Sequence, residues 1–211
     1  LENVLPREIE KRSFELITEE LGERTFPEEQ EPIIKRCIHT SADFDYADNL
    51  CFSEGVVEKA KEAIRNGACI VTDTQMAKSG INKKKLAENF LELVQKLDSD
   101  VDKMIKEDVA ERAKKNGTTR ATACMDKAAA MNRPLIFAIG NAPTALIRLY
   151  ELIEEKKLKP ELVIGVPVGF VNVVQSKELI MQADVPYIVA RGRKGGSNIA
   201  ACICNALLYN M

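Results

Sequence analysis

The clearest chemical signal in the sequence is a loop that combines three cations with three glycines, the heptapeptide Arg-Gly-Arg-Lys-Gly-Gly-Ser at residues 191–197. Glycines let backbone N–H groups come close to a ligand, and the helix expected next adds partial positive charge at its N-terminus. Such a loop suits a phosphate or a carboxylate. It matches neither the G-x-G-x-x-G dinucleotide fingerprint nor the G-x-x-x-x-G-K-[ST] phosphate loop. A solvated basic turn that only reverses the chain is the alternative.

Histidine is the side chain that titrates nearest neutral pH, and the chain has one, His39. It follows Arg36 by three residues and Lys35 by four, so it shares their helix face and turns away from the apolar side that holds Cys37. This placement presents the imidazole for acid–base chemistry, and a surface histidine near a helix end is the alternative. Because residues two apart on a helix point in nearly opposite directions, Cys37 cannot be its nucleophilic partner, which disfavours a Cys-His hydrolase.

Four further polar residues could contact a ligand. Ser13 interrupts the apolar side of the first expected helix, where its hydroxyl either bonds back to the helix or reaches outward. Arg120 stands at an expected helix start, a position that suits an anion but is also common on surfaces. Asn141 lies in the turn Gly-Asn-Ala-Pro-Thr, which is typical of a capping Asn followed by Pro in the first helical turn. Asp73, at the end of an expected strand, is a weaker candidate.

Four apolar runs without alternation predict buried parallel strands, and helices follow three of them. Strands are expected at 69–73, 135–140, 162–166 and 187–191, with a fifth at 91–97, and helices at 6–21, 27–40, 53–66 (capped by Ser53), 143–157, 173–183 and 196–209. Residues 1–211 are therefore expected to form a single α/β domain. Its mostly parallel, Rossmann-like sheet of about five strands is flanked by helices and preceded by an N-terminal helical segment. Open parallel sheets bind ligands beyond the carboxyl ends of their strands, where the 191–197 loop and the unusually apolar 167–171 loop fall.

The composition of the chain argues against several classes of protein. The 211 residues carry 30 Lys and Arg against 32 Asp and Glu, which argues against a general nucleic-acid or membrane-surface binder. No apolar run approaches the roughly 20 residues of a membrane span, and the first residues lack signal-peptide features, so we expect a cytoplasmic protein. Six cysteines without a C-x-x-C pair predict free thiols, and a single histidine excludes a His-rich zinc site.

Several segments of the sequence, taken together, match one protein family. The most specific are Gly-Asn-Ala-Pro-Thr-Ala-Leu at 140–146 and Pro-Val-Gly-Phe-Val at 167–171; the others are Ile-Glu-Lys-Arg-Ser-Phe at 9–14, Arg-Cys-Ile-His at 36–39, Thr-Arg at 119–120, Ser-Lys at 176–177, and 191–197. From about residue 5 to about residue 209, the sequence resembles the precorrin-8X methylmutases, also called cobalt-precorrin-8 methylmutases, of cobalamin biosynthesis. It departs from them at 76–82 and directly after His39, so contacts from those loops are not carried over.

The resemblance implies an isomerase that moves a methyl group from C-11 to C-12 of a contracted tetrapyrrole. This 1,5-sigmatropic shift needs no cofactor and gives hydrogenobyrinate or its cobalt counterpart. The family's catalytic histidine falls on His39, and its substrate-contacting serine and arginine fall on Ser13 and Arg36. A homodimer with active sites near the subunit interface is also implied.

The residues and the resemblance agree on chemistry. The implied substrate is a large flat apolar ring with about eight carboxylates, which suits an apolar floor and a rim of arginines and helix N-termini. We expect Arg36, Arg120, Arg193 and Asn141 to bind it. A non-catalytic carrier of corrinoids or other polycarboxylates is an open alternative that would not need His39. An acyl or amide hydrolase is a second one, and it would need a nucleophile beside His39.

Overall fold

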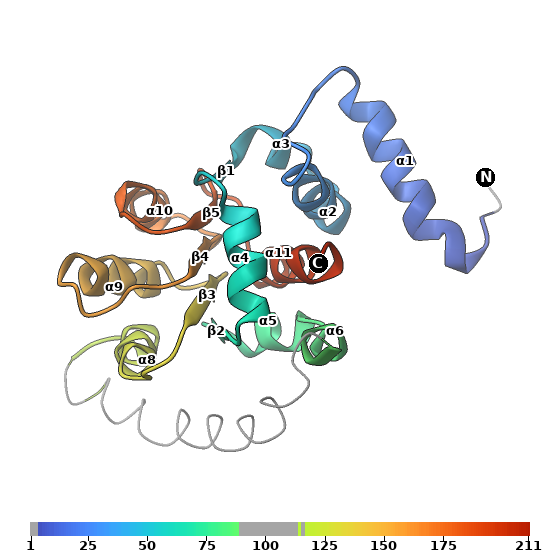
Figure 1. The fold of residues 1–211 in the computed structure, drawn as a ribbon. Helices are drawn as coiled ribbons and strands as arrows, with labels where there is room; N and C mark the ends of the chain where they lie inside the picture. Colours follow the sequence, from blue (N-terminus) through green and yellow to red (C-terminus); the bar gives the residue numbers. More distant parts are fainter. Residues whose placement is uncertain (1–3, 89–113, 115–116) are drawn as a thin grey trace.

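A five-stranded sheet organises the chain (Figure 1), and the computed structural model describes residues 4–88, 114 and 117–211. The strands lie in the order β1-β5-β4-β3-β2, in which β2 to β5 are parallel and β1 is an antiparallel edge strand. Their bounds are β1 Leu50–Phe52, β2 Cys69–Thr72, β3 Leu135–Ile139, β4 Leu162–Gly165 and β5 Tyr187–Ala190. The predicted α/β class, with a mostly parallel sheet of about five strands, is confirmed.

The fifth strand of this sheet is not the predicted one. The segment 91–97 lies outside the described residues, and the edge position next to β5 belongs to the three-residue strand β1. Ser53 continues this pairing, because its N–H donates to the Tyr187 carbonyl oxygen (3.0 Å) and its hydroxyl accepts from the Tyr187 N–H (2.9 Å). The prediction that Ser53 caps the next helix was therefore wrong, and that helix begins at Val56.

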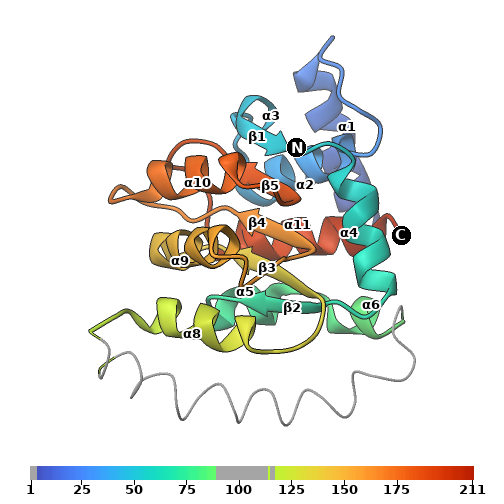
Figure 2. The same ribbon diagram turned by 60° about the vertical axis from the view of Figure 1, so that its left-hand side comes forward.

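Helices cover both faces of the sheet (Figure 2), with α8, α9 and α10 in one layer and α2, α4, α5, α6 and α11 in the other. Alternate residues of β3 face the two layers: Leu135, Phe137 and Ile139 pack with α9, whereas Ile136 and Ala138 pack with α11. The helix bounds are α1 Ile9–Leu21, α2 Glu31–Ser41, α3 Tyr46–Asn49, α4 Val56–Arg65, α5 Gln75–Gly80, α6 Lys83–Glu88, α8 Arg120–Ala129, α9 Pro143–Glu154, α10 Val173–Gln182 and α11 Ser197–Tyr209.

The N-terminal helical segment lies outside these layers. A 3-10 turn at Pro6–Glu8 leads into α1, which packs on the outer side of α2 (Figure 1) and ends at Gly22. Helix α2 starts four residues later than predicted, since Pro27 begins a turn and Pro32 occupies the first helical turn. The short helices α3, α5 and α6 were not predicted, because four to six residues give too little periodicity to recognise.

A buried lysine holds the glycine-rich loop between β5 and α11. Lys177 of α10 is 0% exposed, and its Nζ donates to the carbonyl oxygens of Gly192 and Lys194, at 2.8 Å each. Hydrogen bonds from a charged donor are stronger than neutral ones, so the two bonds from Lys177 fix the backbone of this loop on its α10 side.

Close backbone contact fixes the other side of the same loop. The Gly196 N–H donates to the Val166 carbonyl oxygen beyond β4, at 2.8 Å. Gly195 has a φ of 154°, and a Cβ on it would overlap this same oxygen, so glycine is required there. The loop therefore has its shape before any ligand arrives.

The buried Lys177 gives a test of this packing through pH. Burial lowers its pKa to about 8, whereas an unfolded lysine titrates near about 10.4. Between these values the unfolded chain binds a proton that the folded chain does not, so the stability of the wild type rises with pH in that window. We expect Lys177→Met to lack this rise, which is worth up to roughly 3 kcal/mol.

The measurement is the urea midpoint at pH 7.5 and pH 10, under reducing conditions, for wild type and Lys177→Met. Lys157→Met, at a lysine with 64% of its side chain exposed, is the matched control. An equal change with pH in wild type and Lys177→Met would show that Lys177 is not the buried cation described here.

Candidate active site

At the carboxyl ends of the parallel strands, the turn between β3 and α9 is hydrogen-bonded to a carboxylate of the protein itself. Asp73, directly after β2, accepts the N–H groups of Gly140, Asn141 and Ala142 at 3.0, 2.8 and 2.7 Å. The prediction that Asn141 caps α9 was wrong: the cap position is Ala142, and the carboxylate of Asp73 takes the N–H groups that a ligand anion could have used. The Asn141 side chain is left exposed at this edge.

The other helix starts at this edge are joined by hydroxyl groups. Thr74 donates to the Ser197 hydroxyl oxygen (2.8 Å), which ties the start of α5 to the start of α11. The hydroxyls of Thr119 and Thr144 are 3.1 Å apart and bring the starts of α8 and α9 together. Arg120 is the exposed first residue of α8, as predicted.

The three cations of the 191–197 loop have different roles. Lys194 bridges Asp43 and Asp45, with Nζ 2.6 Å from a carboxylate oxygen of each; hydrogen bonds to these aspartates raise its pKa, and Lys194 in turn lowers the pKa of Asp43. Arg191 pairs with Glu178 at 3.3 Å. Among the residues that the structure describes, no carboxylate pairs with Arg193. Three cations of this loop were expected to be available to an anion, but Arg191 and Lys194 are paired within the protein. Of the three, Arg193 is the one whose guanidinium is available.

Arg193 is stacked on an exposed apolar loop. Its Cζ lies 5.3 Å from the centroid of the Phe170 ring. Phe170 is 80% exposed, and Val168 and Val171 beside it are 51% and 78% exposed. An apolar surface beside a free guanidinium is what a ring with peripheral carboxylates would fit. We call Arg193, Phe170, Arg120 and Asn141 the carboxyl-edge group.

The second candidate region is the outer face of α2. His39 is exposed, and its ring stacks on Phe14 of α1, with the centroids 5.3 Å apart and the planes at 29°. The Arg36 guanidinium, one turn away, lies over both the Phe14 ring (5.3 Å) and the Tyr209 ring (4.9 Å). We call His39, Arg36, Phe14 and Tyr209 the His39 group. It combines an imidazole, a cation and two aromatic rings on one face.

Two polar residues of α1 lie near this group. Glu10 pairs with Arg36 at 2.8 Å, although more than half of the Glu10 side chain is exposed. Ser13 donates its hydroxyl to the Ile9 carbonyl oxygen at 2.9 Å, which is the bond back to the helix named above as one of its two alternatives. Its oxygen lone pairs can still accept from a ligand, so a substrate contact by Ser13 remains a prediction.

The structure gives His39 no nucleophilic partner among the described residues, because no serine or cysteine is hydrogen-bonded to it. Cys37 is buried against Cys202 of α11, and the hydrogen bond with Cys202, together with burial, raises the pKa of the Cys37 thiol well above its usual range. A thiol in that state is a poor nucleophile. This disfavours the hydrolase alternative.

The packing of α2 on α11 relates the two regions. Arg36, in the middle of α2, contacts Tyr209 at the end of α11, whereas Lys194 precedes the start of α11 and pairs with Asp43 beyond the end of α2. The two ends of α11 are about 20 Å apart, because the helix has 13 residues, but His39 stands only four residues before Asp43. The C-terminal end of α2 therefore lies between the His39 group and the 191–197 loop and links them.

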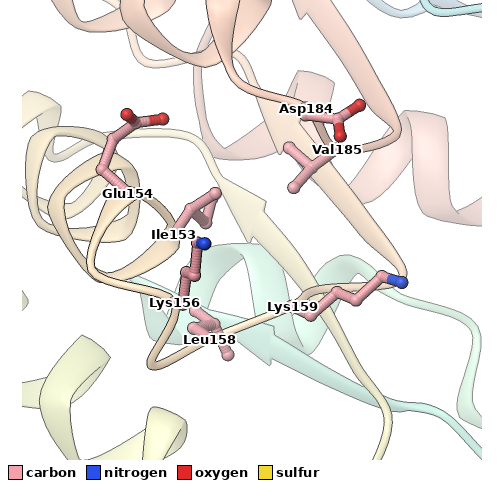
Figure 3. A pocket seen from close by; sticks show the side chains of 7 residues that line it. All are labelled: Ile153, Glu154, Lys156, Leu158, Lys159, Asp184 and Val185. Carbon is pink, nitrogen blue, oxygen red and sulfur yellow. The ribbon is translucent and has the colours of Figure 1, made fainter.

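A hollow in the described surface lies away from both regions. It has a volume of about 420 Å³ and is found where α9 ends and where the chain enters β5, at the amino ends of the strands (Figure 3). Its lining is Ile153, Glu154, Lys156, Leu158, Lys159, Asp184 and Val185. Two acidic and two basic side chains surround an apolar floor, with Glu154 and Asp184 on one side and Lys156 and Lys159 on the other (Figure 3), and none of the predicted site residues contributes to the hollow. We do not assign the site to this hollow.

Within the described ranges, no three His, Cys, Asp or Glu side chains are grouped so that they could hold a metal ion. None of the helices in those ranges is long and apolar enough to cross a bilayer.

Sequence reasoning did not identify Phe14, Tyr209, Glu10 and Lys177 as functional. Phe14, Glu10 and Lys177 stand inside the matched segments, so position within a motif was the available signal. Tyr209 gave no signal, because only the tertiary packing of α11 brings it to Arg36.

Comparison with known proteins identifies the family. A family model described as precorrin-8X methylmutase matches residues 8–210. The chain is 45% identical to the cobalt-precorrin-8 methylmutase of Priestia megaterium, covering 97% of this chain and 88% of that protein. It is 43% identical to that of Salmonella typhimurium, covering 98% and 96%. A crystal structure of the precorrin-8X methylmutase from Thermus thermophilus superposes with a TM-score of 0.80 at 35% identity, covering 96% of both chains. The chain belongs to the precorrin-8X methylmutase family.

Proposed function

We propose that this chain is an isomerase of corrin biosynthesis, which moves a methyl group from C-11 to C-12 of precorrin-8X or cobalt-precorrin-8. The observation that carries the proposal is the exposed imidazole of His39, set on a face with a cation and two aromatic rings, in a chain that belongs to the methylmutase family over nearly its whole length. A carrier would have no use for such an imidazole, and the comparisons give the carrier alternative no support.

His39 supplies the acid–base chemistry in this proposal. The migrating methyl group leaves one carbon of a conjugated ring and binds another, so the electron distribution of the ring changes during the shift. A proton exchanged or shared between the imidazole and the macrocycle favours that redistribution. General acid–base assistance contributes about 10² to 10⁴-fold to a rate, so positioning and distortion of the ring supply the remainder.

Arginines supply recognition of the carboxylates. Arg36 holds the carboxylate of Glu10, and this contact supports a role in carboxylate recognition, in which a substrate carboxylate takes the place of Glu10 in the complex. Arg193 and Arg120 bind further carboxylates at the carboxyl edge, with Asn141 as a neutral hydrogen-bonding partner there, and Ser13 accepts or donates beside the His39 group.

A homodimer is part of the proposal. The exposed Phe170 and Val171, and the outward-facing Ile9 and Leu16 of α1 (52% and 43% exposed), are apolar surfaces that are costly to leave in water. A second subunit that covers such surfaces would also bring its own carboxyl edge within reach of a ligand on the His39 group.

We also propose that residues 1–211 act as one domain in the cytoplasm. The family match from 8 to 210 and the continuous sheet support the first point. None of the six cysteines, all of which lie within the described residues, forms a disulfide, which suits a reducing compartment.

His39→Ala tests the function directly. We expect turnover to fall at least about 100-fold, because the acid–base group is gone, while binding of the product corrinoid and the fold stay intact. The assay follows visible absorbance after incubation with precorrin-8X and, separately, with cobalt-precorrin-8. Circular dichroism and product titration are the controls. Turnover of the variant within threefold of wild type would remove His39 from the mechanism and favour a carrier or a purely positional role.

Arg193→Ala tests carboxylate recognition. A charge-assisted hydrogen bond is worth about 1.5 to 3 kcal/mol, so we expect product affinity to fall about 10-fold or more. Arg191→Ala is the matched control, since that guanidinium is already paired with Glu178. Binding to wild type should also weaken as salt rises above about 0.1 M, because salt screens exposed charges. If product affinity changed with neither the Arg193→Ala substitution nor the salt concentration, the 191–197 loop would be only a turn that reverses the chain.

The dimer is checked by multi-angle light scattering. We expect twice the chain mass of 23.4 kDa at micromolar concentration. A fully active strict monomer under the same conditions would contradict the proposed assembly.

A further inference from the structure

The His39 imidazole lacks the usual means of orientation. In many enzymes one ring nitrogen of a catalytic histidine donates to a carboxylate or a carbonyl, and this bond fixes the ring. In the described part of this chain, His39 makes no hydrogen bond and no ion pair. Its aromatic neighbour is the Phe14 ring, 5.3 Å away and tilted by 29°.

Phe14 is itself held in place. It comes from α1, is half-buried, and also lies against the Arg36 guanidinium, with Cζ 5.3 Å from the ring centroid. Arg36 is fixed in turn by Glu10 at 2.8 Å and by the Tyr209 ring at 4.9 Å. Since Arg36 and His39 are three residues apart on α2, one Phe14 ring covers both side chains.

Stacking leaves the imidazole usable. Phe14 covers one face of the ring, and His39 stays exposed, so the edge with the nitrogens and the other face remain open to a ligand. Aromatic pairs at this separation prefer offset or tilted arrangements over a face-to-face sandwich, so the stack restricts the orientation of the ring. A proton donor gains from such preorganisation, because a displacement of about 1 Å can cost about 100-fold in rate.

We propose that Phe14 is a positioning residue for His39: its stack on the imidazole, instead of a hydrogen-bonded partner, sets the direction in which the nitrogens face the macrocycle. This rests on the proposed function of His39. It also assigns a role to α1, which brings Phe14 to α2 while its own anchorage to the core comes from Ile17 and Leu21, buried one and two turns further on.

The test uses the fact that the chain has a single histidine, so its ring protons give one set of NMR resonances without further assignment. The variants are Phe14→Leu and Phe14→Met, which remove the ring, and Phe14→Tyr, which keeps it. Ile17→Val is the matched control, because it weakens the anchorage of α1 without touching the stack. For each, the histidine resonances, kcat and KM are measured on the full chain.

We expect the wild-type histidine resonances to show the upfield ring-current shift of a stacked imidazole. Phe14→Leu and Phe14→Met lose this shift, and kcat falls about 10- to 100-fold while KM stays within about threefold, since orientation and not binding is impaired. Phe14→Tyr restores the shift and kcat, and Ile17→Val keeps both.

Three results would overturn the proposal. They are full kcat in a ring-free variant, an unshifted histidine in wild type, and an equal loss of kcat in Ile17→Val, which would mean that Phe14 only docks α1. The failure of the proposed function is distinguishable, because it would appear as an inactive wild type whose histidine still shows the stacking shift.

Discussion

The packing of α2 against α11 is the constraint on which the site depends. Helix α11 is apolar on nearly all sides and is buried between the sheet and α2. Cys37 and Ile38 of α2 are 0% and 1% exposed against it, and Thr40 donates to the Cys202 sulfur at 3.2 Å. With that side of α2 committed to the core, helical geometry leaves Arg36 and His39 on the outer side. The apolar residues of α2 therefore determine the side of the helix on which Arg36 and His39 lie, and the polar contacts of these two side chains do not.

Lys177, Lys194 and Arg193 have different roles at the carboxyl edge. Lys177 and Lys194 hold the backbone of the 191–197 loop and join it to the end of α2, so their charges are used within the protein. Arg193 pairs with no carboxylate of the described residues, and we propose that its charge serves a ligand. This division suits the two side chains, since a compact ammonium can bridge two oxygens from one point, whereas a planar guanidinium matches a carboxylate in a forked geometry and also stacks on an aromatic ring. A loop that is fixed from within loses little entropy on binding.

Much of the fold could be predicted from the sequence, because buried parallel strands are continuously apolar and the helices after them are long enough to show periodicity. The edge strand β1 could not, since three residues carry no pattern, and its place is set by pairing with β5. His39 and Arg36 could be placed on one outward face from their spacing alone. Phe14 and Tyr209 could not be joined to them, because they come from the two ends of the chain and meet only when α1 and α11 pack on either side of Arg36.

We propose that the corrinoid binds on the His39 face of α2. The most direct measurement is a titration of wild type with the metal-free product, hydrogenobyrinate, followed by the histidine resonances and by visible absorbance on the same samples. We expect the histidine resonances to move with the same midpoint as the absorbance change and to stop moving at one corrinoid per chain. Saturable binding by absorbance with unmoved histidine resonances would contradict it, because the ligand would then occupy another part of the surface.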